Sequence, residues 1–533
     1  MKVHLLFRER EFDANAPLPA TAAALTQDLG LDAVFASMAG RDEFLLATAR
    51  KVLLASLTDP QEIAYRQRIL EDCLAQPDVV REMYAIAVEA IARERRIWGW
   101  TLSRYPEAWL HRSLDALQLL LGMLRRLRAI AHRHGRQFRS EGFTSLLGML
   151  QSELNDPYLS EIEDHLSRLE LRYGLLLSAT LAQGNTAAGY TLRRSESMRQ
   201  GLLERIQSWV GQLASAERSS YVYEIDPRDE GGVQALGEIR GRGLSSVAIR
   251  LGQAVEHVLS FLSTLRLELG FYIGCLNLRD RLVRKGAPVA IPEALPTPAA
   301  ATIRGADGAR ALAAHGLYDV ALALSMEERP VGNELHADEK RLIVITGANR
   351  GGKTTFLRSL GQAQLMMQCG LYVPAESFRA SVCTGVFTHF KREEDPGMRR
   401  GKLDEELARM SALIDQVGPG ALMLFNESFA STNEREGSEI ARQIVKALLA
   451  AGIEIVFVTH LYDLARGFLL EGRGADLFLR AERLADGRRT FRILEGEPLP
   501  TSYGADLYQR IFGTDEKRGD RRECMMGSPG AWL

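Results

Sequence analysis

The stretch that decides the fold is Gly347-Ala-Asn-Arg-Gly-Gly352-Lys353-Thr354, which matches the pattern G-x-x-x-x-G-K-[ST] of a phosphate-binding loop. It follows the apolar run Leu342-Ile-Val-Ile-Thr346, which favours a strand, and it precedes Thr355-Phe-Leu-Arg-Ser-Leu-Gly-Gln-Ala, which favours a helix. A strand, a glycine-rich loop and a helix in this order place backbone N–H groups around phosphate oxygens at a helix N-terminus. The sequence therefore predicts a nucleotide site at this loop.

The residue types in the loop predict how a nucleotide is held. Glycines let the backbone close around the phosphates, Lys353 supplies positive charge to the β- and γ-phosphates, and the Thr354 hydroxyl binds Mg²⁺. ATP and Mg²⁺ are the expected ligands. The predicted nucleotide-binding residues of this segment are Gly347, Asn349, Gly351, Gly352, Lys353, Thr354 and Thr355.

Two further apolar runs end in polar side chains downstream of the loop. Ala421-Leu-Met-Leu-Phe-Asn426-Glu427 resembles a Walker B strand in pattern, with Asn426 and Glu427 beside Mg²⁺ and Glu427 placed to deprotonate the attacking water. Ile455-Val-Phe-Val-Thr-His460 ends in a histidine that either senses the γ-phosphate or has a structural role. Apolar strands that alternate with amphipathic helices predict an α/β domain with a buried, largely parallel sheet.

The rest of the chain divides by pattern. Residues 1–285 are predicted to be mostly helical, with a small hairpin near 220–240, where Ser220-Tyr-Val-Tyr-Glu-Ile225 alternates like a strand before turn-forming residues. Four prolines make 286–304 a linker. The α/β domain is predicted over 305–513, and the charged segment 514–533 is expected to be a flexible tail.

Composition limits the class of protein. The 533 residues suffice for several domains, and 46% hydrophobic with 25% charged residues is typical of folded, soluble proteins. Lys and Arg number 66 against 68 Asp and Glu, so attraction to nucleic acid requires a local patch. The five cysteines show no C-x-x-C spacing, and we find neither a signal peptide nor an uncharged apolar run of membrane-helix length, so we expect a cytoplasmic protein without a membrane.

The order of these motifs resembles the ATPase domain of the MutS DNA mismatch-repair family, a branch of the ABC-type ATPases. Asn333 with Glu334 looks like the family's Asn-Asp element, which implies that Asn333 contacts the nucleotide. Gly361-Gln-Ala-Gln-Leu-Met-Met-Gln-Cys-Gly-Leu-Tyr-Val-Pro-Ala375 looks like the segment after its loop. Thr459-His460-Leu-Tyr-Asp-Leu464 is similar to its Thr-His switch, and Ser502-Tyr503-Gly504 to its late Ser-Tyr-Gly element.

The helical half resembles the core and lever helices of the same family, for which Leu57-Thr-Asp-Pro-Gln-Glu-Ile-Ala-Tyr-Arg-Gln-Arg-Ile-Leu-Glu71 is the best-matching segment. The resemblance implies a multidomain chain: a mostly α-helical core and lever region, then an α/β P-loop ATPase domain of ABC type that meets a second copy in a homodimer. It implies no mismatch-recognition domain, because the chain starts almost directly at the core-like region.

Two departures from the family pattern leave two functions open. Asn426 stands where the family has aspartate, and Gly401 stands where its signature has a serine that touches the partner's γ-phosphate. The first hypothesis is a dimeric, DNA-binding ATPase that acts as a nucleotide-gated clamp in DNA repair or recombination. The second is an interaction protein that binds ATP but hardly hydrolyses it. A transporter ATPase is disfavoured, because the chain has no Leu-Ser-Gly-Gly-Gln signature and carries a fused helical half.

A candidate DNA contact lies between Ala116 and Ser140, where arginines occur without an acidic residue. Such a cluster neutralises phosphates of double-stranded DNA, or it forms a solvated helix face balanced by acidic neighbours in the fold. The predicted DNA-contacting residues are Arg125, Arg126, Arg128, Arg133 and Arg136.

Overall fold

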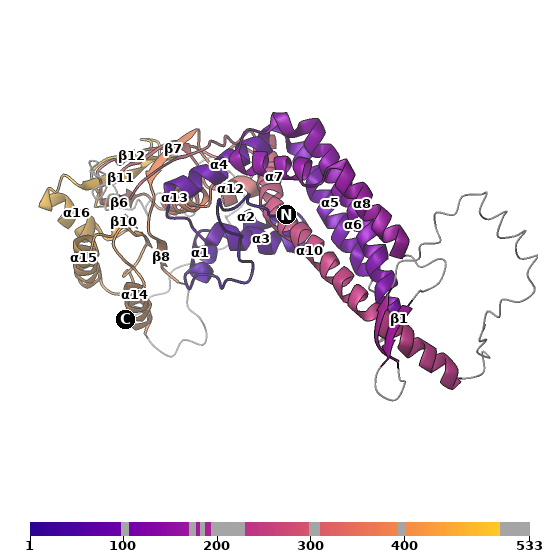
Figure 1. Ribbon diagram of the computed structural model, residues 1–533. Coiled ribbons are helices and arrows are strands. Elements are labelled where there is room, and N and C mark those ends of the chain that lie inside the picture. Colours follow the sequence, from indigo (N-terminus) through magenta and orange to yellow (C-terminus); the bar gives the residue numbers. More distant parts are fainter. Residues whose placement is uncertain are drawn as a thin grey trace, which may run out of the picture. The chain divides into compact units, whose positions relative to one another are not determined.

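A computed structural model describes residues 1–97, 106–169, 177–181, 187–192, 230–297, 310–392 and 401–500 (Figure 1). The chain forms two compact units. The first comprises Met1–Glu11 and Ala75–Leu269, and the second comprises Phe12–Leu74 and Gly270–Leu533. A helical N-terminal region is followed by a mixed α/β domain, as the sequence predicts. The compact units do not follow the predicted boundary at 286–304, because residues 12–74 fold with the α/β domain.

The first unit is built from long amphipathic helices. Residues at helical spacing on α6, such as Leu120, Leu124 and Leu127, are buried, and α5 packs against α6. The N-terminal segment is anchored here, because Leu5 N–H donates to the buried carboxylate of Glu268 at 2.5 Å. The helices are α5 (Pro77–Ile97), α6 (Pro106–His134), the 3₁₀ helix η1 (Gly135–Gln137), α7 (Glu141–Ser152), α8 (Asp156–Leu169) and α10 (Glu230–Arg284), which continues into the second unit.

The predicted hairpin near 220–240 is wrong over the part of it that the structure describes. Residues 220–229 lie outside the described residues, and α10 already begins at Glu230. The sequence Val-Gln-Ala-Leu-Gly-Glu-Ile-Arg over 233–240 has apolar residues at helical spacing, which prevails over the turn-forming residues before it. An antiparallel hairpin occurs earlier, between β1 (Leu177–Leu181) and β2 (Ala187–Leu192).

The segment Leu244–Arg284 of α10 is the one stretch, within the described ranges, that is long and apolar enough to cross a membrane. Of its most apolar window, 61% is buried inside the protein. Burial of this kind is also found in the core helices of soluble proteins, so length and composition alone are weak evidence for a membrane span.

The second unit contains a six-stranded sheet. Its order is β12-β11-β6-β10-β9-β8, and every neighbouring pair is parallel except β11 with β12. Strand β6 is buried along its whole length, which explains its continuous aliphatic sequence. The strands are β6 (Leu342–Gly347), β8 (Val386–Phe390), β9 (Leu422–Asn426), β10 (Glu454–Val458), β11 (Asp476–Arg483) and β12 (Arg489–Glu495).

Parallel pairing brings three strand ends to one edge of this sheet. Ile345 of β6 lies opposite Val458 of β10, and Val458 lies opposite Asn426 of β9. The loops that follow these strands therefore meet at one edge, where α/β folds bind their ligands. The helices of this sheet domain are α13 (Lys353–Gln368), α14 (Lys402–Ile414), α15 (Glu434–Ala450) and α16 (Tyr462–Glu471).

A second, four-stranded sheet has the order β3-β7-β4-β5. Its first strand, β3 (Glu293–Leu295), comes from the proline-rich segment predicted as a linker and pairs in parallel with β7 (Ser377–Ser381). Residues 286–297 are thus part of the fold, and the remainder of the predicted linker lies outside the described residues. The other elements are β4 (Leu312–Leu317), β5 (Asn333–His336) and the short helix α12 (Val320–Ser325).

Buried amides on α13 explain why residues 12–74 join this unit. The Gln362 side chain donates to the carbonyl oxygen of Leu29 at 2.8 Å, and the Gln368 side chain donates to that of Leu57 at 3.0 Å. Both glutamines are fully buried, so these hydrogen bonds satisfy groups that water does not reach. The N-terminal helices of this unit are α1 (Ala22–Asp28), α2 (Leu31–Ala39), α3 (Glu43–Leu54) and α4 (Pro60–Ala75).

Candidate functional site

The glycine-rich loop joins β6 to α13 at the sheet edge. Gly347 and Gly352 have φ of 108° and 94°, in the left-handed region that favours glycine, and Gly352 caps the N-terminus of α13. Gly351 is required for another reason, because a Cβ there would lie 2.8 Å from the Cβ of Ala481. The loop is thus closed tightly against β11, with the N-terminus of α13 at its end.

Lys353 is buried beneath this loop, with 5% of its surface exposed. Its ammonium donates to the carbonyl oxygens of Gly347 and Ala348, each at 3.0 Å. Burial lowers the pKa of Lys353 to about 8, and the nearby charge of Glu427 opposes that shift. A buried cation at a helix N-terminus is a strong site for an anion.

The side chains of Thr354 and Asn426 are hydrogen-bonded beside the glycine-rich loop. The Thr354 hydroxyl donates to the side-chain oxygen of Asn426 at 3.0 Å, which joins the start of α13 to the end of β9. A hydroxyl and an amide oxygen are neutral oxygen ligands, of the kind that Mg²⁺ accepts directly or through water. Asn426 is neutral, so a negative charge for a metal ion at this pair has to come from a carboxylate. Glu427 follows Asn426 directly in the sequence and is the candidate.

Glu427 and His460 form the polar pair of the site. Nε2 of His460 lies 3.0 Å from Oε1 of Glu427. This hydrogen bond, with the charges of His460 and Lys353, lowers the pKa of Glu427, so the carboxylate is ionised at neutral pH. An ionised carboxylate only accepts, so Nε2 of His460 carries the proton, and a water molecule can still donate to the other carboxylate oxygen.

One cavity of about 420 Å³ collects most of the predicted residues. Gly347 and Asn426 do not line it, although Gly347 accepts from Lys353 and Asn426 bonds to Thr354. The predicted residues that line it are Asn333, Asn349, Gly351, Gly352, Lys353, Thr354, Thr355, Glu427 and His460.

The side chain of Asn333 is engaged by β12. Its oxygen accepts from Ile493 N–H at 2.7 Å, and its nitrogen donates to the carbonyl oxygen of Phe491 at 3.4 Å. Asn333 therefore fastens β12 to the rim of the cavity. The Asn349 carbonyl accepts in turn from Arg489 of β12 at 2.8 Å, so this strand also steadies the loop.

The sequence motifs miss the apolar wall of the cavity. Leu322 lies on α12, Met326 follows the last residue of that helix, and Phe491 lies on β12. Phe491 is about half exposed, and its φ of 61° is unusual for a bulky residue. Leu322 and Met326 are far from Phe491 in the sequence, and none of the three belongs to a phosphate-binding pattern, so only the fold brings them to one cavity.

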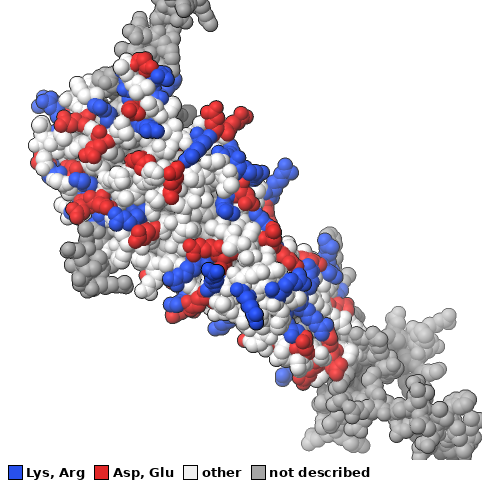
Figure 2. Space-filling model, turned by 90° about the horizontal axis from the view of Figure 1, so that it is seen from above, with Lys and Arg blue, Asp and Glu red and all other residues white. Residues whose placement is uncertain are grey.

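In the first unit, three of the predicted DNA-contacting arginines form ion pairs with acidic residues. Arg125 pairs with Glu163, Arg128 pairs with Asp156, and Arg126 lies 2.6 Å from Glu89. These contacts correspond to the alternative of a helix face balanced by acidic neighbours. Figure 2 likewise shows positive and negative side chains interspersed on the face that it presents.

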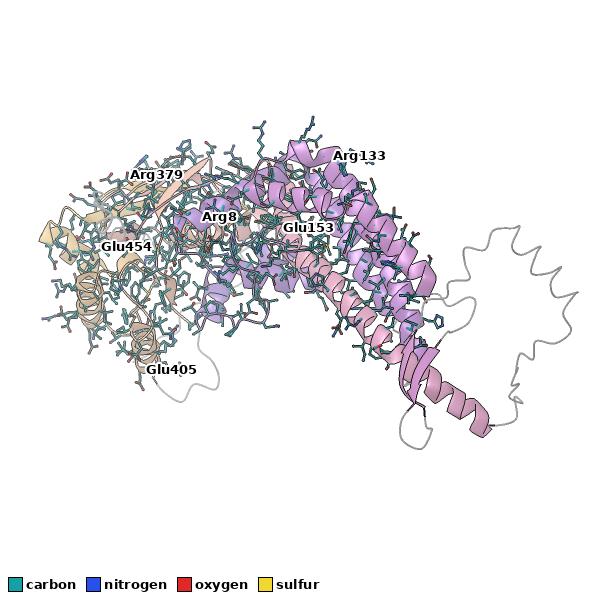
Figure 3. All side chains as sticks on the ribbon, in the orientation of Figure 1. Arg8, Arg133, Glu153, Arg379, Glu405 and Glu454 are labelled. Carbon is teal, nitrogen blue, oxygen red and sulfur yellow. The ribbon has the colours of Figure 1, made fainter. Side chains whose placement is uncertain are left out.

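Arg133 and Arg136 differ from the other three arginines. Both are exposed at the end of α6 and in η1, and no acidic residue in the described part of the chain pairs with them. Arg133, labelled in Figure 3, lies on the outer side of the helices.

Both halves of the chain are similar to known protein families. A family model described as "MutS2 N-terminal domain" matches residues 58–285, and one described as "MutS domain V" matches residues 343–509. Endonuclease MutS2 of Streptococcus equi subsp. equi is 30% identical over 186 residues, which are 34% of this chain and 24% of that protein. DNA mismatch repair protein MutS of Thermotoga neapolitana is 32% identical over 193 residues, 35% of this chain and 23% of that protein.

The aligned part of the chain spans about a quarter of the length of these curated relatives. The two family models together match more of the chain than either relative does. Their matches, over 58–285 and 343–509, follow one another without overlap. The second match contains the loop, Glu427 and His460, which the fold brings to one cavity. From the two models and the relatives together, we conclude that the chain belongs to the MutS family.

Proposed function

We propose that this protein is a cytoplasmic ATPase of the P-loop, ABC type that binds double-stranded DNA as a homodimer and acts as a nucleotide-gated clamp in DNA repair or recombination. The observation that supports this best is the single cavity shared by the glycine loop, Lys353, Thr354, Glu427 and His460. ATP hydrolysis requires N–H donors and a cation for the phosphates and a group that orients water. The names of the two relatives, an endonuclease and a DNA mismatch repair protein, support the binding of DNA.

The loop and the start of α13 would hold the triphosphate. Backbone N–H groups from Gly352 to Thr355 and the ammonium of Lys353 are the donors, while the apolar wall of Leu322, Met326 and Phe491 is suited to a nucleobase. Thr354 and Asn426 would hold Mg²⁺ together with Glu427. When bound, the metal ion supplies positive charge that offsets the charge of the phosphates.

Glu427 is the proposed general base. In the hydrolytic step, a water oxygen bonds to the γ-phosphorus, the bond to the bridging oxygen breaks, and ADP and phosphate are released, while Glu427 takes a proton from the water. His460 holds the carboxylate through its Nε2–H and lines the same cavity, so it is placed to respond to the γ-phosphate.

A second function is favoured by two residues at which the chain departs from the family pattern. Asn426 brings no charge to the metal, and Gly401 gives the N-terminus of α14 no hydroxyl. An ATP-binding clamp that hardly hydrolyses ATP fits both features. The two functions are separated by an ATP-binding titration combined with steady-state hydrolysis, each with and without duplex DNA. Binding with DNA-stimulated turnover supports the ATPase, binding without turnover supports the second function, and absence of binding contradicts both.

ATP affinity is expected to depend on pH through Lys353. Its pKa of about 8 in the free protein means that the ammonium is charged below pH 8, where affinity should be flat. Phosphate anions raise this pKa, so above pH 8 binding takes up a proton and the affinity should fall by about tenfold per pH unit. Calorimetry in buffers of different ionisation enthalpy measures the uptake directly.

A matched control for this pH dependence is Glu427→Gln. Because the charge of Glu427 raises the pKa of Lys353, its removal should move the onset of proton uptake to lower pH. An affinity that stays flat from pH 7 to pH 10 would show that Lys353 does not face the phosphates.

DNA binding is expected to depend more on Arg133 and Arg136 than on the arginines that are paired. Changing both to Ala should lower the affinity for duplex DNA and reduce the slope of log affinity against log salt by about 1.8, at roughly 0.9 for each phosphate contact. The matched variant Arg125→Ala/Arg126→Ala/Arg128→Ala should change the slope less, because these arginines already have acidic partners. Fluorescence anisotropy over a salt series measures both, and unchanged slopes in both variants would exclude this face as the DNA contact.

A further inference from the structure

The backbone that carries Glu427 is strained on both sides of Ser428. Glu427 has φ of 54° and Phe429 has φ of 63°, so two non-glycine residues in a run of three adopt the left-handed conformation. Such a conformation is unfavourable for a residue with a side chain, and it persists only where its surroundings fix it. The segment 427–429 therefore depends on contacts outside itself.

Glu406 of α14 supplies one of these contacts. Its Oε1 accepts from Phe429 N–H at 2.6 Å, and the side chain is buried. Its Oε2 is buried without a hydrogen-bond partner in the described part of the chain, so Phe429 N–H is the group that orients this carboxylate. Gly437 of α15 completes the fit, because a Cβ there would lie 2.3 Å from the carbonyl oxygen of Phe429.

Ser428 and His389 supply the second contact. The Ser428 hydroxyl lies 2.6 Å from the carbonyl oxygen of His389 and 2.8 Å from its Nδ1, and both residues are buried. The His389 ring stacks on Phe429 at 5.4 Å between centroids, which fixes the residue after Ser428 as well. Strand β8, through His389, and α14, through Glu406, thus both hold the segment 427–429.

From this geometry we infer that Glu406 and Ser428 are positioning residues that set the orientation of the Glu427 carboxylate. The inference rests on the proposed function, in which Glu427 is the base. Glu406 lies in the second turn of α14, a helix that follows Gly401. Glu406 therefore links α14, through Phe429 N–H, to the segment that carries the proposed water-activating carboxylate.

The test compares Glu406→Ala, Glu406→Gln and Ser428→Ala with Glu427→Gln by single-turnover ATP hydrolysis at saturating ATP and by ATP titration. Glu406→Ala and Ser428→Ala should slow the single-turnover step about tenfold or more, as expected for a misplaced catalytic group, while the Kd for ATP stays within about twofold. Glu406→Gln retains an oxygen that accepts from Phe429 N–H, so it should restore most of the rate. The double variant Glu406→Ala/Glu427→Gln should be no slower than Glu427→Gln.

Glu405, the adjacent carboxylate on α14 labelled in Figure 3, provides the matched control, because Glu405→Ala leaves the contact to Phe429 intact. Wild-type rates in both Glu406→Ala and Ser428→Ala, with Glu427→Gln slow, would overturn the inference and leave the proposed function standing. Loss of ATP affinity in parallel with the rate would also overturn it, since that marks a general structural role. A wild-type rate no higher than that of Glu427→Gln would overturn the proposed function, and the inference with it. Ser428→Ala removes a single oxygen and keeps the test open if Glu406→Ala does not fold.

Discussion

Glu427→Gln is expected to slow ATP hydrolysis about a hundredfold or more and to leave ATP affinity within about twofold of the wild type. Glutamine has nearly the size of glutamate and still offers an oxygen to Nε2 of His460, which lies 3.0 Å from the carboxylate. It does not take a proton from water at neutral pH, so the loss falls on the hydrolytic step. Phosphate release under single-turnover conditions and a separate nucleotide titration measure the two effects.

Glu434→Gln is the matched control for this substitution. Glu434, at the start of α15, accepts from Tyr462 N–H at 2.8 Å and does not line the cavity, so the same chemical change there should leave hydrolysis intact. Equal hydrolysis by Glu427→Gln and the wild type would exclude Glu427 as the base. If the wild type itself shows no turnover above background, the ATP-binding clamp with little hydrolysis is the better description.

The part of the candidate site that could be predicted lies in short, continuous sequence motifs. The glycine loop was recognisable alone, and the apolar runs that became β6, β9 and β10 predicted strands. Glu427 and His460, after two of these runs, gained a predicted role only because they follow the loop in the same α/β domain. Parallel pairing then brings Lys353, Glu427 and His460 to one edge. This step needs only the rule that the carboxyl ends of parallel strands lie together.

The remaining features depend on contacts between residues far apart in the sequence. The strained turn at Phe429 exists because Glu406 and His389, on other elements, hold it. The pairing of Arg126 with Glu89 joins two helices, and no count of charges within one helix reveals it. The contact of Asn333 with a nucleotide stays a prediction. The hydrogen bonds of its side chain to β12 also join residues far apart in the sequence, and no sequence motif indicated them.

Lys353→Ala is expected to weaken ATP binding by about 1.5–3 kcal/mol, which corresponds to roughly tenfold to 150-fold in Kd. The ammonium is buried at the N-terminus of α13, where it combines its own charge with that of the helix dipole. Alanine is a strong helix former at this position, so α13 should still form. Isothermal titration with ATP, performed beside thermal unfolding, separates loss of the ligand contact from loss of the fold.

Lys340→Ala is the control that makes this measurement specific to the site. Lys340 is also bonded to a backbone carbonyl, that of Gly474 at 2.6 Å, and it does not line the cavity. Both substitutions thus remove one ammonium that is bonded to a backbone carbonyl, but only Lys353 lies at the glycine loop. A general effect of net charge on ATP would weaken binding equally in the two variants, whereas a phosphate contact weakens it in Lys353→Ala alone. Unchanged ATP affinity in a folded Lys353→Ala protein would mean that the glycine loop is not the nucleotide site.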